Sequence, residues 1–146
     1  MIECYLKVGE SMLVELAEKY YKQGYNCAEA ILLAGNEEYG LKLDDNAIHT
    51  FAGFGGGFHC GDLCGALVGG YGVIGAKYIE TKAHDSANIC SYSNKLMCNF
   101  EKHLGARKCM EIKPNFYDKE QKCLFTVKAG AKALQEVIAE IEESRT

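Results

Sequence analysis

The sequence has 146 residues, of which 48% are hydrophobic and 25% are charged, and its formal net charge is −4 at pH 7. This length and composition are typical of one globular domain, which we expect to span residues 1–146. The acidic balance argues against nucleic acids and anionic membrane surfaces as partners, because both select basic patches.

Helical periodicity runs through nearly the whole chain, and no stretch alternates polar and apolar residues with the period of a strand. In chain order, we expect helices from Met12 to a stop at Gly24, from an N-cap at Asn26 to Gly35 or Gly40, from Asp44 or Asp45 through Phe51, from about Asp62 to about Tyr78, from Asp85 or Ser86 to Leu104, and from Asp118 through Ile141. Residues 107–117 are expected to be irregular because they contain Pro114. The sequence therefore predicts an all-α, single-domain, bundle-like packing of five or six helices.

Glycine recurs at every fourth position from Gly53 to Gly69, around the segment GGGFHCGDLCGALVGG at residues 55–70. Gly61, Gly65 and Gly69 would line one face of a helix, and a face without side chains lets a neighbouring backbone come close. We therefore expect a Gly-rich loop followed by a closely packed Gly-rich helix. Membrane insertion is not expected, because the uncharged run after position 62 is too short to cross a bilayer.

The chain contains eight cysteines. Its N-terminal residues lack a basic region followed by an unbroken apolar stretch, so we expect no signal peptide and a cytoplasmic location. Cysteines in that reducing compartment rarely form a structural disulfide framework. They are instead expected to be buried small hydrophobes, metal ligands or redox-active thiols.

Four of the cysteines are predicted to lie where the local electric field favours the thiolate. One would occupy the first helical position if Asn26, with Glu29 three residues later, caps its helix as an imperfect capping box. A second would follow a cap at Asp62, and the other two come after lysine or arginine residues. The four are Cys27, Cys64, Cys109 and Cys123. Because thiolates are both nucleophiles and metal ligands, these residues are the candidate catalytic and metal-binding residues.

The remaining cysteines are weaker candidates. Those expected to be buried small hydrophobes are Cys4, Cys90 and Cys98. Cys60 lies four residues before Cys64, the separation that shares a helix face, so it is a candidate cofactor-binding residue. His59 beside it is a candidate base or ligand. The sequence contains no CxxC pair, no zinc-finger spacing and no CxxCH haem-attachment motif.

The cysteine spacing resembles that of a family of redox-active proteins named for the pattern C–GCAxxG–C–C. The matching residues are Cys27, the run Cys64-Gly65-Ala66-Leu67-Val68-Gly69, Cys109 and Cys123, and the similarity extends over about residues 20–123. The resemblance implies a helical fold and a redox role without an assigned reaction. Related modules in multihaem and iron–sulfur proteins make a cluster conceivable, whereas the missing haem motif leaves haem without support.

Three functions remain open from the sequence. The first is a small cytosolic redox-active protein, a thiol or iron–sulfur oxidoreductase, whose clustered cysteines cycle between dithiol and disulfide or hold an iron–sulfur cluster. In its thiol version Cys64 or Cys27 attacks and a nearby cysteine resolves the mixed disulfide. The second is a non-redox module that binds zinc or another soft metal. The third is a structural helical oligomerisation domain.

The sequence does not identify the redox partner, the electron donor or acceptor, or the metal, if one is bound. The glycine face and the tyrosines are compatible with a homodimer, and the oligomeric state stays open.

Overall fold

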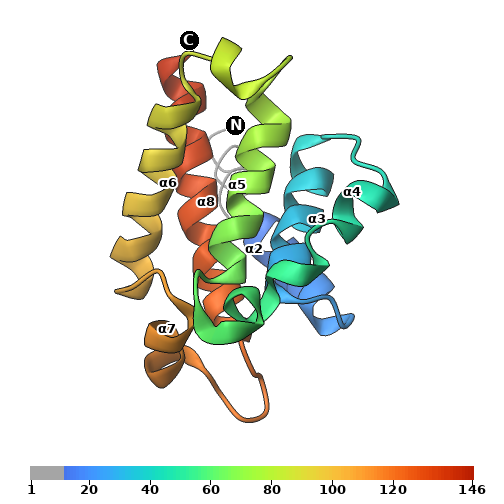
Figure 1. Cartoon of the computed structure of the whole chain (residues 1–146), viewed down its shortest axis with the longest axis vertical. Coiled ribbons are helices and arrows are strands. Elements are labelled where there is room, and N and C mark those ends of the chain that lie inside the picture. The colour runs from blue at the N-terminus through green and yellow to red at the C-terminus, as the bar shows by residue number, and fades with distance from the viewer. Residues whose placement is uncertain (1–11) are drawn as a thin grey trace, which may run out of the picture.

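Helices make up most of residues 12–146, the part of the chain that this computed structural model describes (Figure 1). The α-helices are α2 (Met12–Lys22), α3 (Cys27–Tyr39), α4 (Asp45–His49), α5 (Gly65–Tyr78), α6 (Ile89–Leu104), α7 (Cys109–Phe116) and α8 (Leu124–Ser144). Three short helical turns join them: η1 (Ala52–Phe54), η2 (Gly57–Gly61) and η3 (Ala83–Asp85). No strand is present among the described residues, which confirms the predicted all-α fold.

The helix α5 occupies the middle of the bundle and packs against α3, α6 and α8. The helix α8 also packs against α2 and α6, so most of the long helices share one core (Figure 1). The largest fully buried side chains come from several helices and include Leu13, Ile31, Leu67, Ile74, Leu96, Phe100 and Leu134. Their burial supplies the main driving force for folding, because apolar surface removed from water contributes about 25 cal/mol per Å².

The start of α3 matches the sequence prediction closely. The Asn26 side chain accepts the Glu29 backbone N–H at 2.9 Å, and the Glu29 carboxylate accepts the Asn26 N–H at 3.0 Å. This reciprocal pair is a complete capping box, so two helix-terminal donors are satisfied. The Asn26 amide also donates to the Ala52 carbonyl at 2.8 Å, which ties the start of α3 to the Gly-rich loop.

Glycines on α5 allow that helix to lie against α3. A Cβ at Gly69 would lie 2.6 Å from the Ala28 carbonyl oxygen and 3.0 Å from the Ile31 Cβ, and Gly65 also faces α3. The predicted close packing is therefore present at these two positions. The prediction for Gly61 is wrong, because that residue belongs to η2, before α5 begins.

Residues 107–117 differ from the predicted irregular segment, since most of them form the additional helix α7 with Pro114 inside it. A proline removes one helical hydrogen bond, and α7 ends only two residues later. The apolar face with Cys109 and Ile112 is buried, so tertiary packing compensates for the missing bond.

The last helix also begins later than predicted. The Asp118 carboxylate accepts the N–H groups of Glu120 and Gln121, at 2.9 and 2.7 Å. These bonds close a turn instead of capping a helix, and α8 begins at Leu124.

Candidate functional site

Four cysteines lie at the N-termini of four different helices. Cys27 and Cys109 are the first residues of α3 and α7, while Cys64 and Cys123 are the N-cap residues of α5 and α8. The helix starts lie toward one end of the bundle, the lower end in Figure 1. The predicted cap at Asp62 is wrong, because Cys64 itself holds the N-cap position.

A short antiparallel bridge between Leu63 and Lys108 places two of these cysteines beside each other. The Cys64 N–H donates to the Arg107 carbonyl at 2.9 Å, and the Cys109 N–H donates to the Asp62 carbonyl at 2.7 Å. The bridge therefore fixes the backbone on both sides of the pair. It joins segments that are more than forty positions apart in the sequence.

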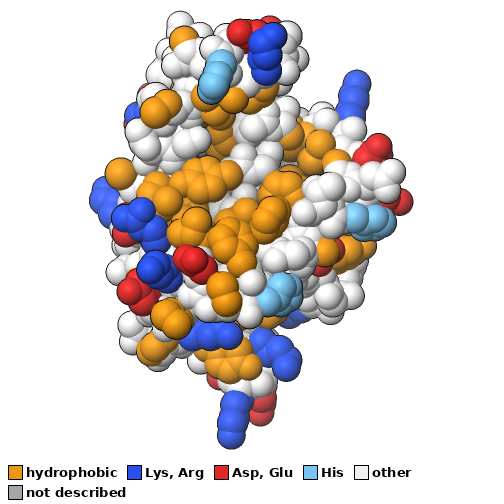
Figure 2. All heavy atoms as spheres, in the orientation of Figure 1, with side chains coloured by type: hydrophobic (Ala, Val, Ile, Leu, Met, Phe, Trp, Pro, Cys, Tyr) orange, Lys and Arg blue, Asp and Glu red, His pale blue; other side chains and the backbone are white. Residues whose placement is uncertain are grey.

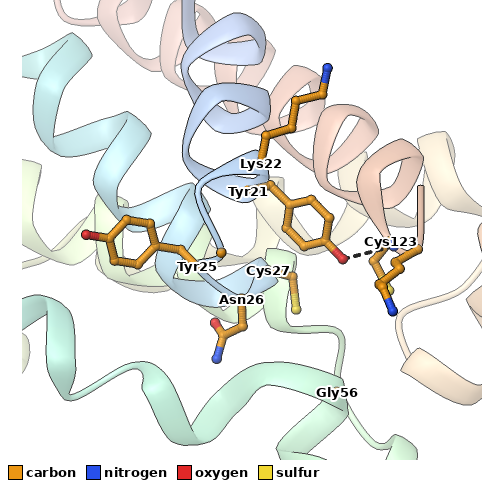
Figure 3. Close-up of a pocket in the computed structure, with 9 residues that line it drawn as sticks. Tyr21, Lys22, Tyr25, Asn26, Cys27, Gly56 and Cys123 are labelled. Atoms are coloured by element: carbon orange, nitrogen blue, oxygen red, sulfur yellow. Dashed lines mark hydrogen bonds between the residues drawn. The ribbon is translucent and has the colours of Figure 1, made fainter. Parts of the chain in front are cut away.

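The sulfur of Cys27 is held between α3 and the start of α5. A Cβ at Gly65 would overlap the Cys27 sulfur, so the closeness of the two helices depends on glycine at that position. The backbone N–H of Gly56, from the Gly-rich loop, lowers the pKa of the same thiol. In Figure 3 the Cys27 side chain projects from the start of α3, below the Tyr21 ring and toward the segment that carries Gly56.

Tyr21 positions the fourth cysteine. The Cys123 backbone N–H donates to the Tyr21 hydroxyl oxygen at 3.0 Å, which joins the end of α2 to the start of α8 (Figure 3). The tyrosine hydroxyl also lowers the pKa of the Cys123 thiol. Cys123 is only half-buried, whereas the other three cysteines are buried.

One small cavity brings these side chains together. It measures about 40 Å³ and is lined by Cys27, Gly56, Cys64, Cys109, Ile112, Lys113, Cys123 and Thr126. We call it the sulfur cavity and its cysteines the four pocket cysteines. Segments spread over almost a hundred residues therefore meet at one sulfur-rich site.

A larger depression adjoins the sulfur cavity. This open cavity measures about 400 Å³ and is lined by Tyr21, Lys22, Gly24, Tyr25, Asn26, Cys27, Gly56, Lys122 and Cys123 (Figure 3). The two cavities share Cys27, Gly56 and Cys123. Cys27 and Cys123 are thus the two pocket cysteines that face the route from solvent.

The model of one protein family, described as "Putative redox-active protein (C_GCAxxG_C_C)", matches residues 25–137. The chain belongs to this C_GCAxxG_C_C family. Comparisons with curated proteins and with solved structures found no match. Within residues 12–146, none of the helices combines the length and apolar character needed to cross a membrane.

The GCAxxG element of the family pattern corresponds here to the run from Cys64 to Gly69, in which Cys64-Gly65 stands in the reverse order of the pattern's Gly-Cys. In this chain the element supplies one sulfur and the two glycines through which α5 contacts α3. Leu63 occupies the bridge to Lys108. The C_GCAxxG_C_C pattern therefore combines site residues with the packing residues that bring them together.

Burial opposes the predicted preference for thiolates. Desolvation is the largest influence on Cys64 and raises the pKa of its thiol to about 12, and charge on Cys27 raises it further. The backbone N–H groups of Ala66 and Leu67 lower the pKa of Cys64 but do not offset burial. The helix N-terminus acts as expected, and the loss of water outweighs it.

The same balance holds at two other pocket cysteines. Desolvation raises the pKa of Cys27, and the N–H of Gly56 opposes that shift. Desolvation also raises the pKa of Cys123, and the charges of Cys27 and Cys109 add to it, whereas Lys113 and the Tyr21 hydroxyl lower it. Burial therefore favours the neutral thiol at these two cysteines and opposes the local field that favours the thiolate.

The arrangement also bears on metal binding. Among residues 12–146, no three His, Cys, Asp or Glu side chains are grouped closely enough to hold a metal ion. The described side-chain positions therefore do not fit a single-metal site without rearrangement.

The weaker candidates lie apart from the sulfur cavity. Cys60 and His59 are exposed in η2, and neither lines either cavity. The Cys60 thiol contacts the Gly57 carbonyl at 3.5 Å. Cys90 and Cys98 are exposed, so their predicted burial is wrong: the buried face of α6 carries residues such as Leu96 and Phe100 instead. Cys4 lies outside the described residues.

Two contributors to the site were not identified from the sequence. Tyr21 was not among the candidate site residues, although its hydroxyl contacts Cys123 from 102 positions away. Lys113 falls in the segment that was predicted to be irregular. Its position on α7, one helical turn after Cys109, becomes informative only once that helix is known.

Replacing Tyr21 with phenylalanine is expected to slow alkylation of Cys123 by about threefold to tenfold at pH 8, because the hydroxyl that lowers the pKa of Cys123 is lost. The pH profile of alkylation should shift to higher pH. Iodoacetamide labelling followed by peptide mass spectrometry measures both quantities. Tyr25→Phe is the matched control, and an equal slowing in that variant would contradict the role of the Tyr21 hydroxyl.

The reduced protein is expected to lose stability as the pH rises from about 8.5, the ordinary cysteine value, toward 12. The raised pKa of Cys64 means that the folded state binds more protons than the unfolded state over this range, so the free energy of unfolding must fall. Urea unfolding at a series of pH values measures the slope of the free energy of unfolding against pH. Cys64→Ala should reduce it and exposed Cys98→Ala should not; an unchanged slope in Cys64→Ala would contradict the assignment.

Proposed function

We propose that this member of the C_GCAxxG_C_C family is a thiol–disulfide redox protein of the cytoplasm. In this proposal Cys123 attacks a substrate disulfide and Cys27 resolves the resulting mixed disulfide. The observation that carries it is the position of these two residues, which line both the sulfur cavity and the open cavity. Cys123 has the more accessible sulfur of the two.

The proposed exchange balances within the dithiol and its substrate. The Cys123 thiol loses its proton to solvent and attacks one sulfur of the substrate disulfide, whose S–S bond breaks and releases one thiolate. The Cys27 thiol then loses its proton and attacks the Cys123 sulfur, releasing the second thiolate. The protein loses two electrons and forms one disulfide, and the substrate gains those electrons as two thiols.

The electrostatic environment supports this order of attack and alters the role suggested from sequence for Cys64. Lys113 and the Tyr21 hydroxyl both lower the pKa of Cys123 against the effect of burial. Cys64 is only 3% exposed and lies in the inner part of the site, with a pKa of about 12. Since the thiolate is the attacking form, Cys64 is poorly suited to meet a substrate from solvent.

The two inner cysteines, Cys64 and Cys109, can take part in the same thiol–disulfide exchange. Cys27 and Cys109 each interact electrostatically with the other three pocket cysteines. We assign Cys64 and Cys109 as a second thiol pair with which a Cys27 disulfide can exchange. The N–H groups at the surrounding helix starts would stabilise each thiolate as it forms.

An anaerobic spectrum combined with metal analysis tests this function against the alternatives. The proposal predicts a colourless, metal-free reduced protein in which a small disulfide oxidises at least one pair of pocket cysteines. Visible absorbance with bound iron and sulfide would instead identify a cluster protein. One zinc per chain would identify a metal module, and thiols that resist oxidation would favour a structural oligomerisation domain. Each of these other outcomes would overturn the dithiol proposal.

A further inference from the structure

The open cavity has the size and lining of a small-molecule site. Its volume of about 400 Å³ lies within the range of roughly 300–1,000 Å³ that is typical of ligand pockets. The phenol ring of Tyr21 provides apolar surface, and the Asn26 side chain is polar. The sulfur-bearing residues Cys27 and Cys123 also line it, so a bound molecule would lie next to the proposed dithiol.

The charge around the two cavities has one sign. Their lining contains Lys22, Lys113 and Lys122 and no aspartate or glutamate, although the whole chain carries a net charge of −4. Figure 2 also shows several Lys and Arg side chains toward the lower end of the molecule, over α7 and the loop that follows. A cationic lining raises the local concentration of anions and speeds their arrival.

Lys122 is the lysine most directly placed for this role. The Lys122 N–H donates to the Asp118 carbonyl at 2.6 Å, and the Asp118 N–H donates to the Lys122 carbonyl at 3.0 Å. This tight loop holds Lys122 at a φ of 56°, a left-handed conformation that costs a residue other than glycine about 1 kcal/mol. The loop therefore places a lysine at the cavity edge in spite of that conformational cost.

The other two lysines have supporting positions. The Lys113 charge acts on the Cys123 sulfur and lowers its pKa. Lys22 is paired with Glu18 at 2.8 Å, and in Figure 3 its side chain extends away from Cys27 and Cys123. Neutralising Lys122 should consequently have a larger effect on an anionic ligand than neutralising Lys22.

We propose that the open cavity binds a low-molecular-weight disulfide that carries carboxylate groups. Lys122 pairs with a carboxylate, the Tyr21 ring contacts the body of the molecule, and one disulfide sulfur meets Cys123. This inference rests on the proposed function and uses the same exchange: Cys123 and Cys27 are oxidised to a disulfide, and the bound molecule is reduced to two thiols.

The test compares an anionic with a neutral aromatic disulfide: dithiobis(nitrobenzoate), which carries carboxylates, and dithiodipyridine, which is neutral. The protein is the full chain with Cys4, Cys60, Cys90 and Cys98 replaced by serine, so that only the four pocket cysteines react. Stopped-flow absorbance follows release of the chromogenic thiol, and peptide mapping identifies the disulfide that forms. The variants are Lys122→Gln and, as a matched control from the same loop, Lys119→Gln.

We expect Lys122→Gln to slow the reaction with the anionic probe about fivefold and to change the neutral probe less than about twofold. Lys119→Gln should leave both rates nearly unchanged, and the anionic rate should saturate with probe concentration. If both probes oxidise the pocket but Lys122→Gln has no selective effect, or Lys119→Gln matches it, the anion site is overturned while the dithiol function stands. If neither probe forms a pocket disulfide, the proposed function fails and this inference fails with it.

Discussion

Cys123→Ser is expected to slow disulfide formation in the pocket by at least about 100-fold when the reduced protein meets a small disulfide, because a serine hydroxyl does not supply a thiolate. Cys123 is the half-buried pocket cysteine beside the open cavity, while the other three are buried. Quenched reaction mixtures analysed by non-reducing peptide mass spectrometry give the rate.

Two other cysteine variants make this result specific. Cys90→Ser removes an exposed thiol on α6 and should leave the rate unchanged. Cys60→Ser tests the exposed thiol in η2 and should change the rate by less than about twofold, because Cys60 does not line either cavity. A larger loss of the rate of disulfide formation in Cys64→Ser than in Cys123→Ser would contradict the assignment of Cys123 as the attacking residue.

Gly65→Ala is expected to destabilise the protein by about 3 kcal/mol and to displace the Cys27 sulfur. The added Cβ would overlap that sulfur and would lie 3.0 Å from the Phe54 carbonyl oxygen and 3.2 Å from the Ala28 nitrogen. Neither backbone contact can move without separating α3, η1 and α5. Urea unfolding of the reduced protein measures the loss of stability, and disulfide yield measures the damage to the site.

The same helix provides the control for this substitution. A Cβ at Gly75 would meet nothing within 4 Å, so Gly75→Ala should raise stability by about 0.5–1 kcal/mol through helix propensity. If Gly65→Ala also raised stability, the Cys27 sulfur would not lie against α5 as described.

Local patterns were sufficient to predict the all-α fold and much of its course. Asn26 and Glu29 are close in sequence, so their capping box was visible before the structure was known. The spacing of Gly65 and Gly69 likewise indicated a face without side chains. Neither pattern could show that Cys27 would occupy the contact between the two helices, because that depends on how α3 and α5 are placed.

The errors arose where tertiary structure prevailed over local chemistry. Pro114 favoured an irregular segment, yet burial of Cys109 and Ile112 supports α7 around it. Asp62 appeared to be a cap, but its carbonyl accepts the Cys109 N–H across a bridge to a distant segment. Pairings of this range leave no local signal in a single sequence.

The thiol pKa values show a second reason why the site could not be fully predicted from the sequence. Helix starts and neighbouring lysines favour thiolates, and the sequence identifies those features. The opposing effect is the loss of water around the sulfur, which depends on all the elements that cover it. At Cys64 that loss is the largest influence on the pKa, so proximity to a helix start was not enough to predict its protonation state.

Disulfide mapping of the wild-type protein after brief exposure to one equivalent of a small disulfide tests the central claim most directly. The account predicts that peptides containing Cys27 and Cys123 become linked first and that the link disappears on reduction. First linkage of Cys60, Cys90 or Cys98, with the four pocket cysteines still free thiols, would contradict it.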